Sequence, residues 1–87
     1  MSDANDQAVE FFIKRADYNL NLAAQHCRGK EFEKGMNLYK EAYAFVTKAL
    51  KSRPDDPVLK KKLEDTKLLY QEAKKNCSDQ GGNPATK

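Results

Sequence analysis

The feature that most constrains this chain is a long stretch, residues 7–77, with apolar side chains at helical spacing and very few helix breakers. No proline occurs in it before Pro54, and its only glycines are Gly29 and Gly35. Its apolar residues recur at steps of three and four, which places them on one face of a helix. The alternation of apolar and polar residues that is typical of strands occurs nowhere. The sequence therefore predicts an all-α fold.

Two breaks divide this stretch. Gly29 followed by Lys30 is typical of a left-handed helix C-terminus with a basic residue near the helix dipole. At residues 53–57 each of two prolines disfavours helix in the residue before it, and Asp56 can cap a helix whose first residue is Pro57. Short turns between helices predict an antiparallel three-helix bundle with up-down-up topology. The expected helices cover residues 7–28, 31–52 and 57–76.

Each expected helix carries one apolar face. The face of residues 31–52 is unusually wide, so this helix must contact more than one neighbour or leave one flank free for a ligand. The third helix carries a heptad-like seam, which is typical of helices that cross at a shallow angle. The seam consists of Leu59, Leu63, Thr66, Tyr70, Ala73 and Cys77.

Composition and charge suit one small domain. The chain has 87 residues and a net charge of +3, with 16 basic and 13 acidic side chains interspersed along it. We expect the three lysines at residues 60–62 to be a solvated helix face and not a nucleic-acid site. Small and polar residues predict a disordered N-terminus over residues 1–6 and a disordered linker or tail over residues 78–87. The domain is then residues 7–77.

Candidate catalytic or metal-binding groups are sparse. His26 and Cys27 are adjacent on a helix and point about 100° apart, and Cys77 is far along the chain. No phosphate-binding loop and no convergent group of titratable side chains is recognisable. We therefore expect no enzymatic activity, no metal and no cofactor. Two cysteines without a secretory signal indicate an intracellular chain, and no apolar run is long enough to insert into a membrane.

One segment, residues 29–49, has the pattern of two helical families. Phe32, Gly35, Tyr39 and Ala42 occupy the aromatic, small, aromatic and alanine positions of a tetratricopeptide repeat. In that family a proline should end the second helix near residue 47, whereas here the next proline is Pro54. A solenoid also needs about three repeats, and the chain has one copy.

The longer second helix resembles that of the MIT (microtubule interacting and trafficking) domain. The resemblance covers residues 7–76 and depends on Leu38-Tyr39-x-x-Ala42, on Ala49-Leu50-Lys51 and on Tyr70-x-x-Ala73. It implies a three-helix bundle that binds short motifs of ESCRT-III subunits or related autophagy and protein-transport factors. It also implies a cytoplasmic adaptor that partners recruit to endosomal or other vesicular membranes.

The ligand of MIT domains is commonly an amphipathic helix in the groove between the second and third helices. A helix in a groove needs neighbouring helices with apolar inner edges, although the same apolar positions equally suit a core. Where many MIT sequences carry an aspartate this chain has Gln71, and its lysines make an acidic ligand plausible. The candidate partner-binding residues are Tyr43, Val46, Leu50, Leu63, Thr66, Lys67, Tyr70, Gln71 and Lys74.

Two other functions stay open. A tetratricopeptide-like or structural three-helix module would oligomerise through its wide apolar bands, whereas a peptide-binding adaptor should remain a monomer. An anion or membrane-surface binder would use the lysines of the third helix, and its binding would depend steeply on salt.

Overall fold

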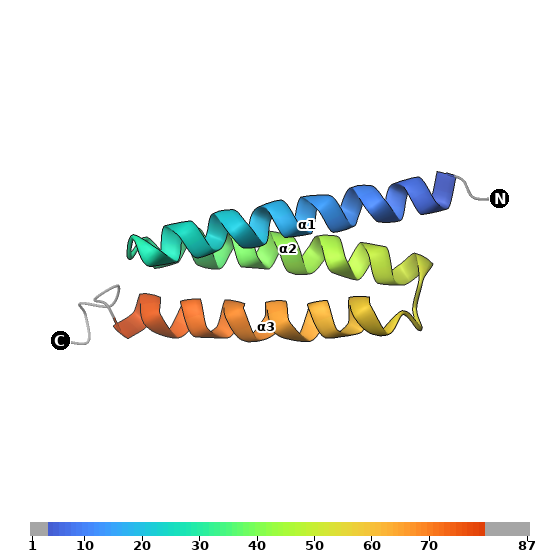
Figure 1. Ribbon diagram of the computed structural model, residues 1–87. Coiled ribbons are helices and arrows are strands. Elements are labelled where there is room, and N and C mark those ends of the chain that lie inside the picture. Colours follow the sequence, from blue (N-terminus) through green and yellow to red (C-terminus); the bar gives the residue numbers. More distant parts are fainter. Residues whose placement is uncertain (1–3, 80–87) are drawn as a thin grey trace.

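The computed structural model describes residues 4–79, and within them it has three helices and no strand. They are α1 (Ala4–Arg28), α2 (Phe32–Ser52) and α3 (Pro57–Cys77). The predictions of an all-α chain and of three helices are therefore confirmed. In Figure 1, α1 runs from right to left, α2 returns to the right and α3 runs left again.

The turn between α1 and α2 follows the predicted break, with one difference. The left-handed residue is Lys30, at φ 64°, and not the glycine before it. Gly29 N–H donates to the carbonyls of Gln25 and His26, and Lys30 N–H donates to Cys27 at 2.9 Å. These bonds satisfy carbonyl groups that the end of α1 leaves without helical partners.

The start of α3 is capped as predicted. Asp56 Oδ1 accepts hydrogen bonds from the backbone N–H groups of Val58, at 2.9 Å, and Leu59, at 3.2 Å. Pro57 occupies the first turn of α3, where its missing N–H costs nothing. α2 continues past Thr47 to Ser52, so its last turns bring Ala49 into the core.

α1 begins earlier than the sequence predicts. Its first residue is Ala4, whereas the sequence predicts a start at residue 7. The Asp6 carboxylate lies 3.0 Å from Arg53 Nη2 and sits in the first turn, where a negative charge is favourable. Residues 1–3 and 80–87, and with them most of the expected C-terminal tail, lie outside the described residues.

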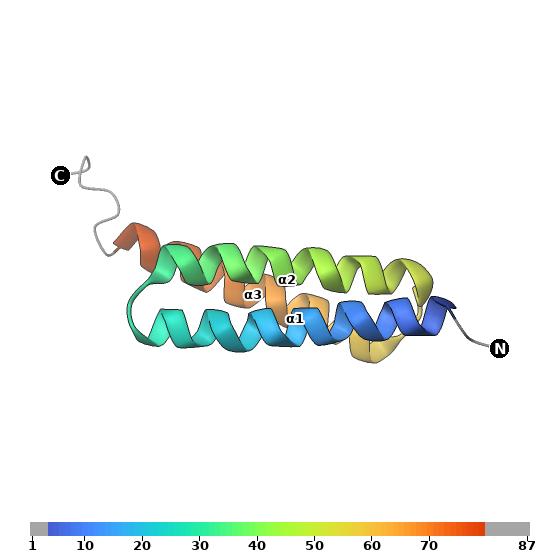
Figure 2. The same ribbon diagram turned by 90° about the horizontal axis from the view of Figure 1, so that it is seen from above.

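The core is built mostly from small side chains in three clusters along the bundle. α2 contacts both α1 and α3 closely, while α1 and α3 approach each other only weakly. Figure 2 shows α1 and α2 side by side with α3 crossing behind them. The three are a proximal cluster (Val9, Ala49, Leu59), a central cluster (Ala16, Ala42, Val46) and a distal cluster (Ala23, Tyr39, Ala73).

Candidate functional site

Two of the sequence-predicted site residues belong to the core. Val46 and Thr66 are both 0% exposed. Val46 is part of the central cluster, and Thr66 Oγ1 donates to the carbonyl of Lys62 at 2.7 Å. Val46 is therefore a packing residue, which is the alternative that its apolar position left open. Thr66 is equally buried, but it borders a hollow between α1 and α3.

The other apolar candidates lie at the edge of the core. Leu50 and Leu63 are half-buried against the central cluster, and Tyr70 is half-buried against the distal cluster. Tyr43 is 38% exposed. The apolar surface that α2 and α3 leave between them is therefore narrow.

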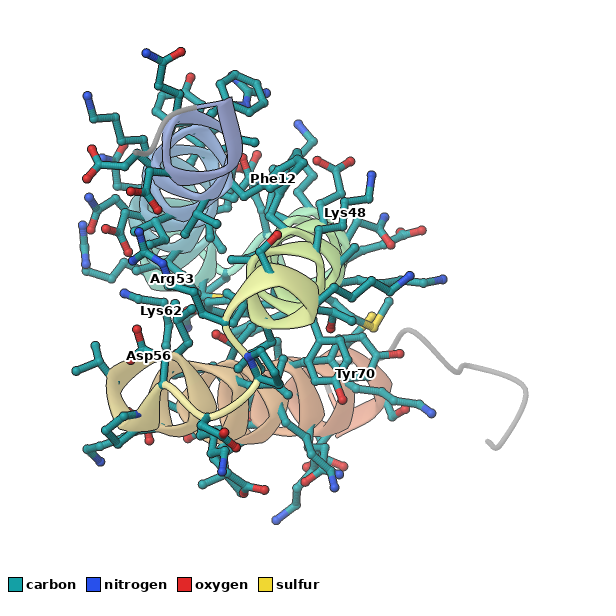
Figure 3. The ribbon with its side chains drawn as sticks, turned by 90° about the vertical axis from the view of Figure 1, so that its right-hand side faces the viewer. Phe12, Lys48, Arg53, Asp56, Lys62 and Tyr70 are labelled. Carbon is teal, nitrogen blue, oxygen red and sulfur yellow. The ribbon has the colours of Figure 1, made fainter. Side chains whose placement is uncertain are left out.

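The polar candidates lie on the outside of α3. Lys67, Gln71 and Lys74 are all exposed. In the end-on view of Figure 3, Tyr70 lies between α2 and α3, whereas Lys62 lies between α1 and α3. The structure thus brings some predicted residues together along α2 and α3, and it places a hollow between α1 and α3.

A hollow of about 430 Å³ lies between α1 and α3, where the two backbones stay apart. Leu20 of α1 faces Val58 and Leu69 of α3 across it, and Val58 is 68% exposed. A second hollow of about 220 Å³ continues along the same two helices and also reaches Tyr39 of α2. Leu69 lines both hollows, so we treat them as one α1–α3 groove. Its lining also includes Ala24, Cys27, Arg28, Lys61, Lys62, Asp65, Glu72 and Asn76.

Most charges around the first hollow are paired. Lys62 Nζ lies 2.7 Å from Asp17 Oδ1 and so links α3 to α1, and Lys61 Nζ lies 3.5 Å from Asp65 Oδ2. In the second hollow, Arg28 and Glu72 have no ion-pair partner among the described residues. The distal part of the groove therefore carries one charge of each sign that pairs with no other described residue.

Burial shifts the pKa values of two titratable groups at this end of the groove. Burial raises the pKa of the Cys27 thiol above its ordinary value of 9.0, and the charge of Glu72 raises it further. Burial also raises the pKa of the Tyr39 hydroxyl above 10.0. A thiol nucleophile requires a lowered pKa, so Cys27 has the properties of a packing residue.

His26 has a structural position at the α1–α2 turn. Its Nδ1 lies 2.6 Å from Glu31 Oε1, a contact that bridges the end of α1 and the residue before α2. The hydrogen bond to His26 holds the pKa of the Glu31 carboxyl below its ordinary value of 4.5, and Lys34 adds to this shift. Within residues 4–79, no group of three or more His, Cys, Asp or Glu side chains could hold a metal ion.

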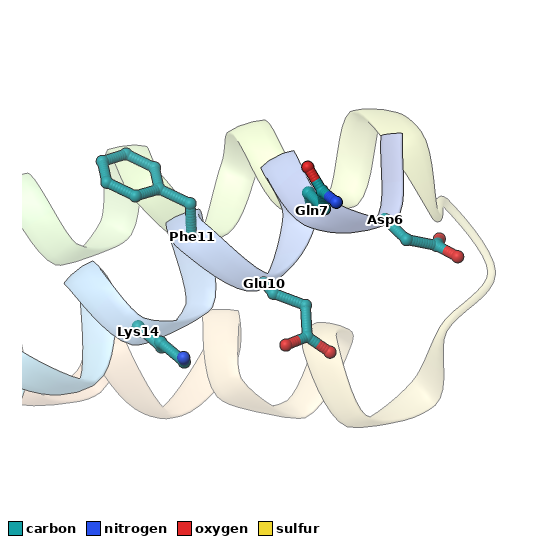
Figure 4. A pocket seen from close by; sticks show the side chains of 5 residues that line it. All are labelled: Asp6, Gln7, Glu10, Phe11 and Lys14. Carbon is teal, nitrogen blue, oxygen red and sulfur yellow. The ribbon is translucent and has the colours of Figure 1, made fainter. Parts of the chain in front are cut away.

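A third hollow lies on the outer surface of α1. Its volume is about 480 Å³, and Figure 4 shows its lining: Asp6, Gln7, Glu10, Phe11 and Lys14. All five residues belong to one helix, so no other described element faces them across this hollow. Its notable member is Phe11, which is 56% exposed.

Sequence reasoning missed the α1–α3 groove because it followed a single flank of α3. Leu63 and Tyr70, four residues after Leu59 and Thr66, turn toward α2. Leu69, three residues after Thr66, turns toward α1. Leu69, an apolar residue on this second flank, was the sequence feature that could have indicated the groove.

Comparison with known proteins finds no matching family model, curated protein or solved structure. In the described part of the chain, none of the helices combines the length and apolar character needed to cross a membrane.

Proposed function

We propose that this chain is a binding module that holds a short peptide segment of a partner protein in the α1–α3 groove. The main support is Leu69, which lines both hollows and so connects them along α3. Peptide recognition between helices requires an apolar floor flanked by polar groups. Leu20 and Val58 extend the apolar floor, and Asp65 and Glu72 lie along its α3 edge.

The two charges that line the second hollow define the chemistry of the ligand. Arg28 and Glu72 line the same hollow, so a ligand that carries an acidic and a basic residue near its apolar side chains would complement both. The α2–α3 side has a different character, because Lys67 and Lys74 would select an acidic ligand there. The charge preference of the ligand thus differs between the two possible grooves.

The resemblance to MIT domains indicates which partners this binding module would have and where in the cell it would act. The chain would be an up-down-up MIT-like bundle whose ligands are ESCRT-III tails or related motifs in vesicular trafficking and autophagy. It would be a cytoplasmic monomer that partners recruit to endosomal or other vesicular membranes. The length of α2 and the packing of Tyr70 beside Ala73 are in keeping with this assignment.

Three matched variants test the groove. Peptides from ESCRT-III C-terminal tails, labelled with a fluorophore, serve as probes in anisotropy titrations. Leu69→Asp should weaken binding at least about tenfold, because it places a charge against the apolar face of the peptide. Leu68→Asp changes the neighbouring residue, which is 58% exposed and outside the groove, and should have little effect. Tyr43→Asp alters an α2 residue with the same 38% exposure as Leu69.

The outcomes separate the alternatives. If Tyr43→Asp abolishes binding while Leu69→Asp does not, the ligand occupies the α2–α3 side and the proposed groove is wrong. If no ESCRT-III peptide binds the wild-type chain, the trafficking assignment fails. Melting curves for each variant ensure that a loss of affinity is not a loss of fold.

Self-association is a second candidate function. Val58 and Leu68 of α3 are 68% and 58% exposed, and apolar side chains this exposed can mark a contact with another copy of the chain. Light scattering over a range of concentrations tests this: a monomer at all concentrations argues against the oligomerisation module.

A further inference from the structure

A group of aromatic and basic side chains covers the side of the bundle where α1 meets α2. The rings of Phe11 and Phe12 meet edge to face with centroids 5.7 Å apart, and Phe12 stacks on Phe45 at 6.3 Å. Phe11 and Tyr18 project into solvent and are 56% and 55% exposed. We name this surface the aromatic–basic face: Phe11, Phe12, Arg15, Tyr18, Phe45 and Lys48.

The two cations of this face lie over rings and not beside carboxylates. The Arg15 guanidinium is 5.7 Å from the ring centroids of both Tyr18 and Phe45. Lys48 Nζ is 5.7 Å from the ring centroid of Phe12. Both cations are exposed, and within residues 4–79 neither has an ion-pair partner. An aromatic ring attracts a cation without cancelling its charge, so Arg15 and Lys48 each keep a positive charge on this face.

The carboxylates of the same helices do not pair with either cation among the described residues. Glu41 accepts a hydrogen bond from Asn19 Nδ2 at 3.0 Å, and Asp6 is paired with Arg53. Figure 4 shows Glu10 pointing away from Phe11. Figure 3 places Phe12 and Lys48 on one side of the bundle and Lys62, on the α1–α3 side, across from them. The aromatic–basic face is therefore separate from the groove.

We infer that the aromatic–basic face binds the surface of an anionic lipid bilayer, with α1 and α2 lying along it. Aromatic rings favour the interface between headgroups and hydrocarbon, and basic side chains are attracted to anionic headgroups. The two signals together give reversible peripheral binding without a membrane-spanning segment. Rings that project from a surface suit a flat partner, whereas a peptide requires a groove.

A second copy of the chain is a poorer occupant. A two-fold contact through this face would bring the Arg15 and Lys48 side chains of both copies together, and like charges repel. The inference goes beyond peptide binding and does not depend on it, because Leu20 faces the groove from the other flank of α1. A peptide and a bilayer could be bound at the same time.

Co-sedimentation with vesicles tests the inference on the 87-residue chain. The chain should bind vesicles that contain phosphatidylserine and not vesicles of phosphatidylcholine alone, and added salt should weaken binding. Phe11→Ser with Tyr18→Ser should reduce the partition coefficient by about tenfold or more. The control is Leu68→Ser on α3, which removes an apolar side chain of similar exposure outside the groove and should have little effect.

A second pair of variants tests the charge. Lys48→Glu should reduce binding by about tenfold at low salt, whereas Lys67→Glu on α3 makes the same change elsewhere and should have a smaller effect. Equal losses for the two lysine variants would overturn the inference, as would a loss for Leu68→Ser as large as that for the Phe11 and Tyr18 pair. Failure of the wild-type chain to bind phosphatidylserine vesicles would also overturn it. The inference would fail as well if the variants lost binding because their oligomeric state had changed. Circular dichroism confirms that each variant is folded.

Discussion

Gly35 of α2 lies directly against Cys27 of α1. A Cβ atom at position 35 would overlap Cys27 Sγ and would lie 3.1 Å from the carbonyl oxygen of Ala23. Glycine inside a helix costs about 1 kcal/mol relative to alanine, so its presence here needs a compensating reason. The close approach of α1 and α2 beside the distal cluster supplies that reason.

Replacing Gly35 by alanine should therefore destabilise the fold by about 1–3 kcal/mol, because the overlap outweighs the gain in helix propensity. Urea unfolding followed by circular dichroism measures the change. Gly29→Ala is the control, since a Cβ there would lie 3.6 Å from its nearest neighbour and should be tolerated. Adding Cys27→Ala to Gly35→Ala should recover part of the loss. A Gly35→Ala variant as stable as the wild type would disprove this close packing.

The cap of α3 gives a second prediction. Asp56→Ala should lower stability by about 1 kcal/mol, because the N–H groups of Val58 and Leu59 lose their acceptor. Asp55→Ala removes the same charge one residue earlier, where no cap bond is made, and should have a much smaller effect. Asp56→Asn should retain most of the stability. Thermal melts of the three variants decide the matter, and equal losses at the two aspartates would contradict the cap.

The turn between α1 and α2 should respond to acid. The folded-state pKa of Glu31 is lowered, chiefly by its hydrogen bond to His26. Its contribution to stability is therefore fully present above the ordinary value of 4.5 and is lost as the pH falls through the folded-state pKa. The difference in Tm between wild type and Glu31→Gln should be constant near neutral pH and shrink below pH 4.5. A difference that grows with acidification would exclude this role.

Those elements that depend on local chemistry could be predicted from the sequence. The break at Gly29 and the cap at Asp56 require only residues that are close in the chain, and the structure has both. The early start of α1 could not be foreseen, because Asp6 meets Arg53 across 47 positions of sequence.

The position of the groove depends on how each helix is oriented about its own axis in the assembled bundle. Periodicity shows that Thr66 and Val46 lie on apolar faces, but both face inward because alanines let α2 approach its two neighbours closely. Which pair of helices then stays apart is a property of the whole core. The spacing of Leu69 identifies its flank of α3, whereas only the assembled bundle shows that this flank borders an opening.

The stability of Tyr70 variants shows whether this residue belongs to the core or to an exposed binding surface between α2 and α3. Its ring packs on the distal cluster, so Tyr70→Asp should destabilise the domain by about 2–4 kcal/mol, because the carboxylate would lose solvation there. Tyr43→Asp, at a position that is 38% exposed, should cost less than about 1 kcal/mol. Chemical denaturation measures both, and Tyr70→Phe, which keeps the ring, should remain close to the wild type.

The lysines beside Tyr70 complete this test without disturbing the core. Lys67 and Lys74 are exposed, so reversing both to glutamate should leave the melting temperature nearly unchanged. If the peptide occupies the α1–α3 groove, the double reversal should also leave its affinity unchanged, because neither residue lines that groove. A large change in affinity with an intact fold would instead place the ligand between α2 and α3, weaker binding indicating an acidic peptide and tighter binding a basic one.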